Sequence, residues 1–136
     1  MRISNTKTTI AILFITFLFS TFNLLNAQEN ELKEFQFLIS KEDNLIKLKS
    51  LEGSAWLDLS FSKNNYNPQA IDEYGMTYLQ KENLKQDKRL ADYLITIIKT
   101  EDGFELKGVK GTTWTDLKFS LPEGKTQAIN QFGMVK

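Results

Sequence analysis

The side chains that could carry out chemistry in this sequence are carboxylates, lysines and tyrosines, because the 136-residue chain contains no histidine and no cysteine. The lack of these two residue types excludes thiol nucleophiles, Ser-His-Asp triads, histidine-ligated metals and thiolate zinc sites. The sequence also has no glycine-rich phosphate loop and no acidic run with EF-hand spacing. We therefore predict that the protein uses no cofactor and no metal.

Asp58 and Asp116 are the carboxylates on which a catalytic hypothesis would rest, because they occupy similar segments, Leu-Asp-Leu-Ser and Thr-Asp-Leu-Lys. Two close carboxylates can share a proton and carry out acid–base chemistry. Neither segment matches the Asp-Thr/Ser-Gly motif of aspartic proteases, and Asp residues near turns usually bond to the backbone. We expect each aspartate to bind the turn of its own segment. A small carboxylate-dependent hydrolase that uses Asp58 and Asp116 is the alternative.

Trp56 and Trp114 are the leading candidates for binding a partner. Strict strand alternation places Trp56 on the face opposite Leu59 and Phe61. Exposed tryptophan often anchors a protein or glycan partner, whereas a covered tryptophan forms a second apolar layer. The presence of Trp in both segments favours packing, because a structural role is needed twice and a single ligand site is not.

Three further residues complete the candidate binding set. Gln69 and Gln127 occur at matching places, and we expect their amides to satisfy backbone groups of the preceding strand rather than to contact a ligand. Tyr66 lies in the loop 63–67, where the second half of the chain has Gly124. This difference makes the loop the best place to find a function that is specific to one half.

These candidates recur because the second half of the chain repeats the first. An offset of 58 residues carries Trp56 onto Trp114 and aligns 35–78 with 93–136 without a gap, and 15 of the 44 aligned pairs are identical. A repeat of this length is marginally stable alone without disulfides or metal, and repeats bury their apolar faces against each other. We expect the two repeats to share one core, related by an approximate two-fold axis.

Each repeat begins with three segments that alternate apolar and polar residues, which is the period-two pattern of half-buried strands. The first two segments are joined by the turns Glu-Asp-Asn (42–44) and Glu-Asp-Gly (101–103), whose Asn and Gly accept the positive φ of a hairpin turn. The apolar faces of these segments predict the centre of the core, at Leu48, Leu59, Phe61, Leu106, Leu117 and Phe119.

The last segment of each repeat, 69–75 or 127–133, is predicted as a short helical turn. Ile71 and Tyr74 are three residues apart, and Gly75 stands where a left-handed residue ends a helix. A strand ending in a turn is the alternative. The expected fold is mainly β, α+β by its short helical turns: two tandem three-stranded repeats, each with a short terminal helix or strand, packed with pseudo-two-fold symmetry into one sandwich- or barrel-like domain.

Residues 1–27 have the order of a secretory signal peptide: the basic residues Arg2 and Lys7, an apolar run, and a small residue, Ala27, for cleavage. The apolar run is short for a membrane span of roughly 20 residues, although an uncleaved anchor is the alternative. We expect a leader at 28–34, repeats at 35–78 and 93–136, and a connector at 79–92. The predicted protein is exported, periplasmic or extracellular, with no stable membrane span after signal removal.

Charge excludes two classes of partner. Residues 28–136 carry 15 basic and 17 acidic side chains, and they lack the clustered positive field that nucleic acid or anionic lipid requires. The motif Gly-x-x-Trp-x-Asp-Leu-x-Phe-Ser resembles small exported bacterial proteins, a resemblance that implies no activity. The sequence predicts a non-catalytic binding or assembly protein of the bacterial periplasm or extracellular space, with a protein or glycan partner. It names neither the ligand nor an oligomeric state.

Overall fold

The computed structural model describes residues 32–62, 67–80 and 87–136, which form ten β-strands and no helix. The strands of the first half are β1 (Gln36–Glu42), β2 (Leu45–Glu52), β3 (Asp58–Ser62), β4 (Gln69–Asp72) and β5 (Gly75–Thr77). Those of the second half are β6 (Leu94–Lys99), β7 (Gly103–Lys110), β8 (Asp116–Ser120), β9 (Thr126–Asn130) and β10 (Gly133–Val135).

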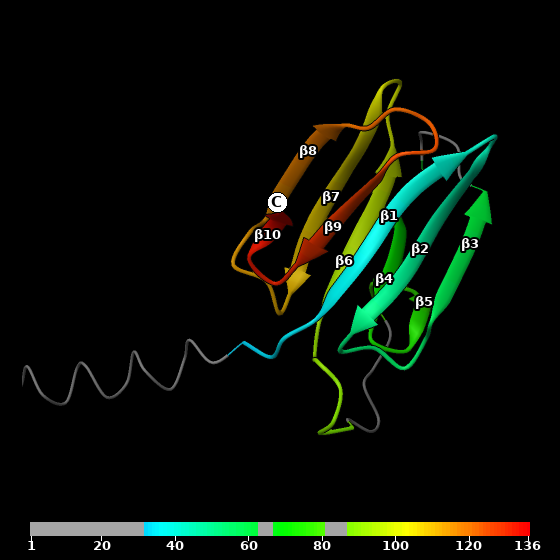
Figure 1. The fold of residues 1–136 in the computed structure, drawn as a ribbon. Helices are drawn as coiled ribbons and strands as arrows, with labels where there is room; N and C mark the ends of the chain where they lie inside the picture. Colours follow the sequence, from blue (N-terminus) through cyan, green and yellow to red (C-terminus); the bar gives the residue numbers. More distant parts are fainter. Residues whose placement is uncertain (1–31, 63–66, 81–86) are drawn as a thin grey trace, which may run out of the picture. The chain divides into compact units, whose positions relative to one another are not determined.

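The strands form two antiparallel sheets of five strands each, in the orders β10-β9-β1-β2-β3 and β5-β4-β6-β7-β8 (Figure 1). The prediction of a mainly β protein is confirmed. Both sheets are open, with β10 and β3 at the edges of the first and β5 and β8 at the edges of the second. The barrel alternative is therefore wrong.

Each sheet takes strands from both halves of the chain. In the first sheet β9 pairs with β1, with Ile129 opposite Phe37. In the second sheet β4 pairs with β6, with Ile71 opposite Ile95. The last hairpin of each half thus completes the sheet that is built by the other half, so neither half contains all the strands of one sheet.

The expectation of a helical turn at 69–75 and 127–133 is wrong, and the strand alternative is correct. These segments form the hairpins β4–β5 and β9–β10. The Asp72 carboxylate accepts hydrogen bonds from the backbone N–H groups of Tyr74 (2.8 Å) and Gly75 (3.1 Å), which closes the turn. Gly75 has a positive φ of 127° because it follows a tight hairpin turn, not because it ends a helix.

The core lies between the two sheets. Its fully buried side chains include alternate residues of the four central strands β1, β2, β6 and β7: Phe37, Ile39, Ile46, Leu48, Ile95, Ile97, Phe104 and Leu106. Of the predicted core centre, Leu48, Phe61 and Leu106 are buried, whereas Leu59, Leu117 and Phe119 pack against the core and are only partly buried. The partly buried residues all lie on β3 or β8, which are edge strands.

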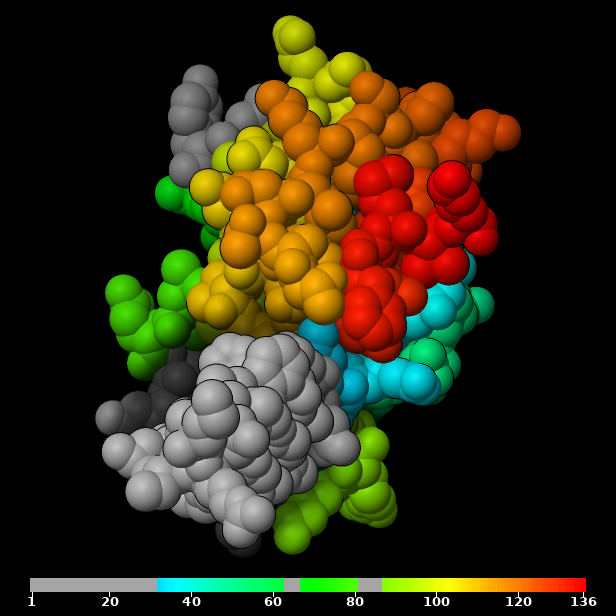
Figure 2. Space-filling view, turned by 90° about the vertical axis from the view of Figure 1, so that its left-hand side faces the viewer, coloured from blue at the N-terminus to red at the C-terminus, as the bar shows by residue number. Residues whose placement is uncertain are grey.

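The edges β8 and β10 lie side by side, although they belong to different sheets (Figures 1 and 2). A Cβ atom on Gly133 of β10 would lie 3.7 Å from the Leu117 side chain of β8. Met134 is 48% exposed, and Phe132 in the adjacent turn is 69% exposed. The apolar interior therefore reaches the surface along this edge.

An aromatic pair in the core joins the two halves, just before the starts of β1 and β6. The rings of Phe35 and Tyr93 stack with their centroids 4.0 Å apart and their planes at 19°. The Phe35 N–H donates to the side-chain oxygen of Gln131 (3.2 Å), and the Tyr93 N–H donates to the carboxylate of Glu73 (3.3 Å). The residue before the first strand of each half is thus bonded to the last hairpin of the other half.

Two glycines allow the chain to approach this aromatic pair. Gly53 and Gly111 have positive φ values of 86° and 77°. A Cβ atom on Gly53 would lie 2.5 Å from the carbonyl oxygen of Glu34, and one on Gly111 would lie 2.2 Å from that of Asp92. Both the backbone conformation and the close approach therefore require glycine.

Replacing these glycines with alanine is expected to destabilise the protein more than the same change at Gly124. Gly124 also has a positive φ, of 80°, but nothing lies within 4 Å of a Cβ atom there. All three substitutions share a strain of about 1–3 kcal/mol, and only Gly53→Ala and Gly111→Ala add a backbone clash. Urea denaturation of the three variants measures the difference. Equal losses at Gly53 and Gly124 would contradict the close approach.

Candidate functional site

Both tryptophans lie in the core. Trp56 and Trp114 are each 8% exposed. The Trp56 indole N–H donates to the carbonyl oxygen of Asp72 (3.0 Å), and the Trp114 indole N–H donates to that of Asn130 (3.0 Å). Each ring thereby links the start of an edge strand, β3 or β8, to a hairpin of the opposite sheet. Both tryptophans are thus packed in the core, as the packing hypothesis expects, and neither is exposed as an anchor for a partner.

The two glutamines also have structural bonds. The Gln69 amide donates to the carbonyl oxygens of Ala70 (3.0 Å) and Thr77 (3.3 Å). The Gln127 amide makes the matching bonds on β9 and β10. They bond to backbone groups as expected, but to their own hairpin rather than to the preceding strand. Tyr66 lies outside the described residues.

Asp58 and Asp116 are not brought together. They begin β3 and β8, which are edge strands of different sheets on opposite sides of the fold, and both are exposed (Figure 1). Asp116 lies 3.8 Å from the Lys107 ammonium. The expectation that each aspartate binds its own turn is wrong for the described residues, where no such bond is present. In the second half of the chain, a threonine bonds to the turn before β8 instead. The Thr112 hydroxyl donates to the carbonyl oxygen of Trp114 (2.6 Å).

A shallow groove of about 390 Å³ lies on the first sheet, over β1, β2 and β3. Its outward-facing lining is Leu38, Ser40, Lys47, Lys49, Asp58, Ser60 and Thr126. The Lys47 ammonium is already paired with the Glu42 carboxylate at 2.7 Å. Asp58 is the one residue of the predicted site that lines this groove. Lys49, Ser60 and Thr126 are exposed and Ser40 is half-buried, and no buried polar group lines the groove.

A larger cleft of about 570 Å³ lies at one end of the sheets. Three connections meet there: the β1–β2 turn, the β6–β7 turn and the β8–β9 loop. Its lining residues are Lys41, Asp43, Lys99, Glu101, Asp102, Ser120, Leu121, Pro122 and Glu123. None of the site residues predicted from the sequence is among them.

Lys41 is the unusual member of this lining, because it is a lysine that is only 9% exposed. Phe37, Ile39 and Lys41 alternate along the inner face of β1, so the lysine continues the row of core side chains to the end of the sheet. Lys41 lines the cleft, and among the described residues no acceptor bonds its ammonium group. Lys99 holds the matching place on the inner face of β6, and it too has no ion-pair partner there.

The walls of the cleft are tied together by hydrogen bonds. The Glu123 carboxylate accepts the backbone N–H of Asp43, which joins the β8–β9 loop to the β1–β2 turn. The Ser120 hydroxyl donates to the Asp102 carboxylate (3.0 Å), which joins the end of β8 to the β6–β7 turn. These bonds link the three connections that line the cleft.

The sequence contained one signal for this cleft. Lys41 and Lys99 are an identical pair in the repeat alignment, and each stands at an inward position of an alternating strand. A lysine at an apolar position is unexpected, because lysine is almost never fully buried unless it is paired. Nothing in the sequence indicated that three separate connections would meet at this cleft.

A buried carboxylate lies at the other end of the sheets. Glu73 is 2% exposed, and burial raises its pKa above the usual value of 4.5, with the nearby Asp72 and Asp92 acting in the same direction. Gln131 holds the matching place in the second half and accepts a matching backbone hydrogen bond. The second half therefore provides a neutral version of the same site.

Glu73→Gln is expected to stabilise the protein at neutral pH and to have little effect in acid. Below about pH 4.5 the Glu73 carboxyl is protonated in both the folded and the unfolded chain. As the pH rises, the unfolded chain ionises first, so the wild type loses stability until the pH exceeds the raised pKa. Urea denaturation from pH 3.5 to 7.5 measures this difference.

The reverse change, Gln131→Glu, is the matched control for this prediction. It should add a second loss of stability with rising pH, because it places a carboxylate in the equivalent buried site. A stability difference between Glu73→Gln and the wild type that does not change with pH would contradict the raised pKa.

Three negative findings complete the description. In residues 32–62, 67–80 and 87–136, no group of three or more acidic side chains is placed to hold a metal ion. The same residues contain no helix that could cross a membrane. No protein-family model, no curated protein and no solved structure matches this chain.

Proposed function

We propose that the protein is a small, exported, non-catalytic binding protein that takes an anionic group of its ligand into the end cleft. The observation that carries this proposal is Lys41, a residue that is only 9% exposed, lines the cleft and makes no side-chain hydrogen bond or ion pair among the described residues. A lysine that stands on the inward row of a strand is normally paired, because lysine is almost never fully buried without a partner. A bound carboxylate or similar group would supply the missing partner.

The size and rigidity of the cleft also favour binding. Its volume of about 570 Å³ lies within the range of roughly 300–1,000 Å³ that is typical of small-molecule sites. The ligand is thus a small molecule or the end group of a protein or glycan partner. The bonds of Glu123 and Ser120 preorganise the site, which reduces the entropy lost on binding.

The alternative function is a small hydrolase that uses Asp58 and Asp116. A carboxylate pair needs the two groups within reach of one substrate atom. Their positions on edge strands of different sheets give this alternative no geometric support. With no histidine or cysteine in the chain, the non-catalytic proposal is the simpler one.

The two halves are, in this proposal, copies of one module related by an approximate two-fold axis that passes between Phe35 and Tyr93. These stacked residues hold the same place in the two repeats. The 58-residue offset also carries the strand order of one sheet onto that of the other. The bonds of Trp56 and Trp114 match in the same way.

Export is supported by the basic, apolar and small-residue order of residues 1–27. The mature chain is expected to begin at Gln28, with or without cyclisation of that residue. Intact-mass spectrometry of the protein recovered from the periplasm or the medium measures its first residue. A membrane-bound protein that retains residues 1–27 would contradict export by cleavage.

Anion binding in the cleft is tested by titrating the ¹⁵N-labelled protein with sodium acetate and with inorganic phosphate, against sodium chloride at matched ionic strength. Acetate is expected to shift the amide signals of Lys41, Lys99 and Leu121 and to saturate at millimolar concentration. Lys41→Met should weaken this binding at least about tenfold, because a charged hydrogen bond contributes roughly 1.5–3 kcal/mol.

Lys118→Met is the matched control, because Lys118 is exposed on β8 and does not line the cleft. It should leave acetate binding unchanged. Lys41→Met is expected to fold, since Met has a similar volume and an apolar side chain suits the inward row of β1. Equal acetate shifts in the wild type and in folded Lys41→Met would refute the proposed site.

A further inference from the structure

We propose that the ligand of the end cleft is a small zwitterion, an aminocarboxylate of the amino-acid or short-peptide class. Its carboxylate would bind Lys41 and Lys99 at the inner end, and its ammonium would bind Asp43 and Glu101 at the rim. This inference rests on the proposed function above and specifies the chemistry of the ligand.

The charges of the cleft are arranged in two layers. The inner layer is cationic, because Lys41 and Lys99 stand on the inward-facing rows of β1 and β6. The outer layer is anionic, because Asp43, Glu101, Asp102 and Glu123 are exposed residues of the turns and the loop. A ligand that enters along this direction meets carboxylates first and ammonium groups last.

The rim carboxylates differ in how they are used. Asp102 accepts the Ser120 hydroxyl, and Glu123 accepts the backbone N–H of Asp43. The carboxylates of Asp43 and Glu101 make no hydrogen bond or ion pair within the part of the chain that the structure describes. Two acceptors thus remain available at the rim, above two ammonium groups that also lack a partner.

The charge balance of the lining argues against a simple anion as the preferred ligand. Its two lysines are opposed by four carboxylates, so a phosphate or a polyanion would gain at the inner end and be repelled at the rim. A cationic group on the same ligand turns that repulsion into attraction. Complementary charge at both ends also fixes the orientation of the ligand and discriminates against singly charged molecules.

The apolar lining residues, Leu121 and Pro122, indicate what joins the two charged groups. Both belong to the segment that follows β8, and Leu121 is 5% exposed. An aliphatic or peptide segment of a few bonds would lie against them. An aminocarboxylate with a short apolar spacer therefore matches the inner layer, the lining and the rim.

The test is a series of ω-aminocarboxylates, from glycine through 4-aminobutyrate to 6-aminohexanoate, which vary the distance between the two charges. Each is compared with its N-acetyl form, which lacks the ammonium, and with its amide, which lacks the carboxylate. Dissociation constants come from ¹⁵N-shift titrations at pH 7. At the best spacer length the zwitterion should bind about two- to fivefold more tightly than its N-acetyl form, the difference expected from one exposed ion pair.

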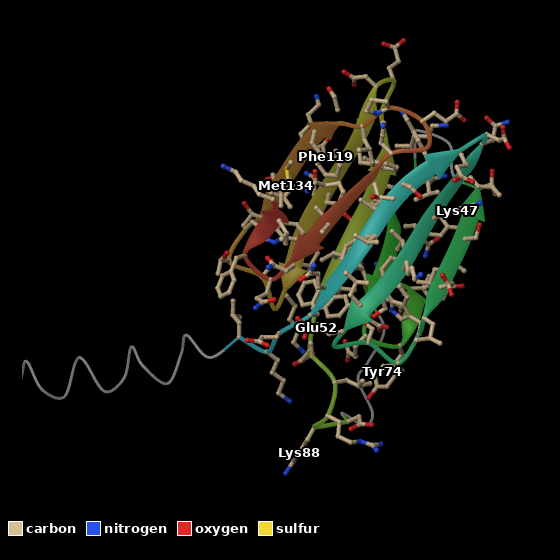
Figure 3. All side chains as sticks on the ribbon, viewed as in Figure 1. Lys47, Glu52, Tyr74, Lys88, Phe119 and Met134 are labelled. Carbon is tan, nitrogen blue, oxygen red and sulfur yellow. The ribbon has the colours of Figure 1, made fainter. Side chains whose placement is uncertain are left out.

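Variants assign the two ends of the ligand. The double variant Asp43→Asn, Glu101→Gln should weaken the binding of the zwitterion, because its ammonium loses both rim carboxylates. Binding of the N-acetyl form should be unchanged or tighter, because the repulsion between its carboxylate and the rim is reduced. Lys41→Met should weaken both. Glu52→Gln is the matched control, since this exposed carboxylate lies at the far end of β2 (Figure 3) and should change neither dissociation constant.

The outcomes separate this inference from the function on which it rests. Equal binding of a zwitterion and its N-acetyl form at every spacer length would refute the zwitterion and leave an anion-binding cleft. Tighter binding of the N-acetyl form would refute it in the same way. Failure of every probe, including acetate, to shift the cleft signals would refute the binding cleft itself.

Discussion

The pairing of β1 with β9 and of β4 with β6 is the constraint on which the rest of the structure depends. Through it, each half of the chain finishes the sheet of the other, and the core is enclosed only when both are present. The stack of Phe35 on Tyr93 and the indole bonds of Trp56 and Trp114 lie where these exchanged hairpins meet the opposite sheet. Stability therefore comes from contacts between distant parts of the sequence.

The end cleft follows from the same arrangement. The inward rows of β1 and β6 extend to the end of the sheets, where the apolar core stops and Lys41 and Lys99 take the next inward places. A lysine can bury its long aliphatic stem and still keep its ammonium group in water, which suits this position between core and opening. The loops above them supply carboxylates, so the two layers of charge arise from strand alternation below and turn composition above.

The sequence predicted the strands of each repeat well, because alternation such as Phe-x-Phe-x-Ile at 35–39 reports directly on one buried face. It failed at 69–75, where a spacing of three residues between Ile71 and Tyr74 suits a helix and also a strand followed by a turn. Strict alternation also placed Trp56 on the wrong face. Trp56 precedes β3, so the two-residue alternation of that strand does not determine where its side chain lies. The cleft could not be predicted, because the loops that meet there are brought together by the pairing of strands from the two halves. The alternation within single strands does not reveal that pairing.

The exchange of hairpins has a consequence for the origin of such a chain. If the halves are copies of one module, a chain with a single copy would leave the edge of its first strand without a partner. It would complete both sheets only by giving its hairpin to a second molecule and accepting one in return. The present protein would then be a fused homodimer, whose connector replaced a concentration-dependent association. Two fused copies would be free to diverge, and Glu73 and Gln131, which hold matching places in the two halves, would be one such difference.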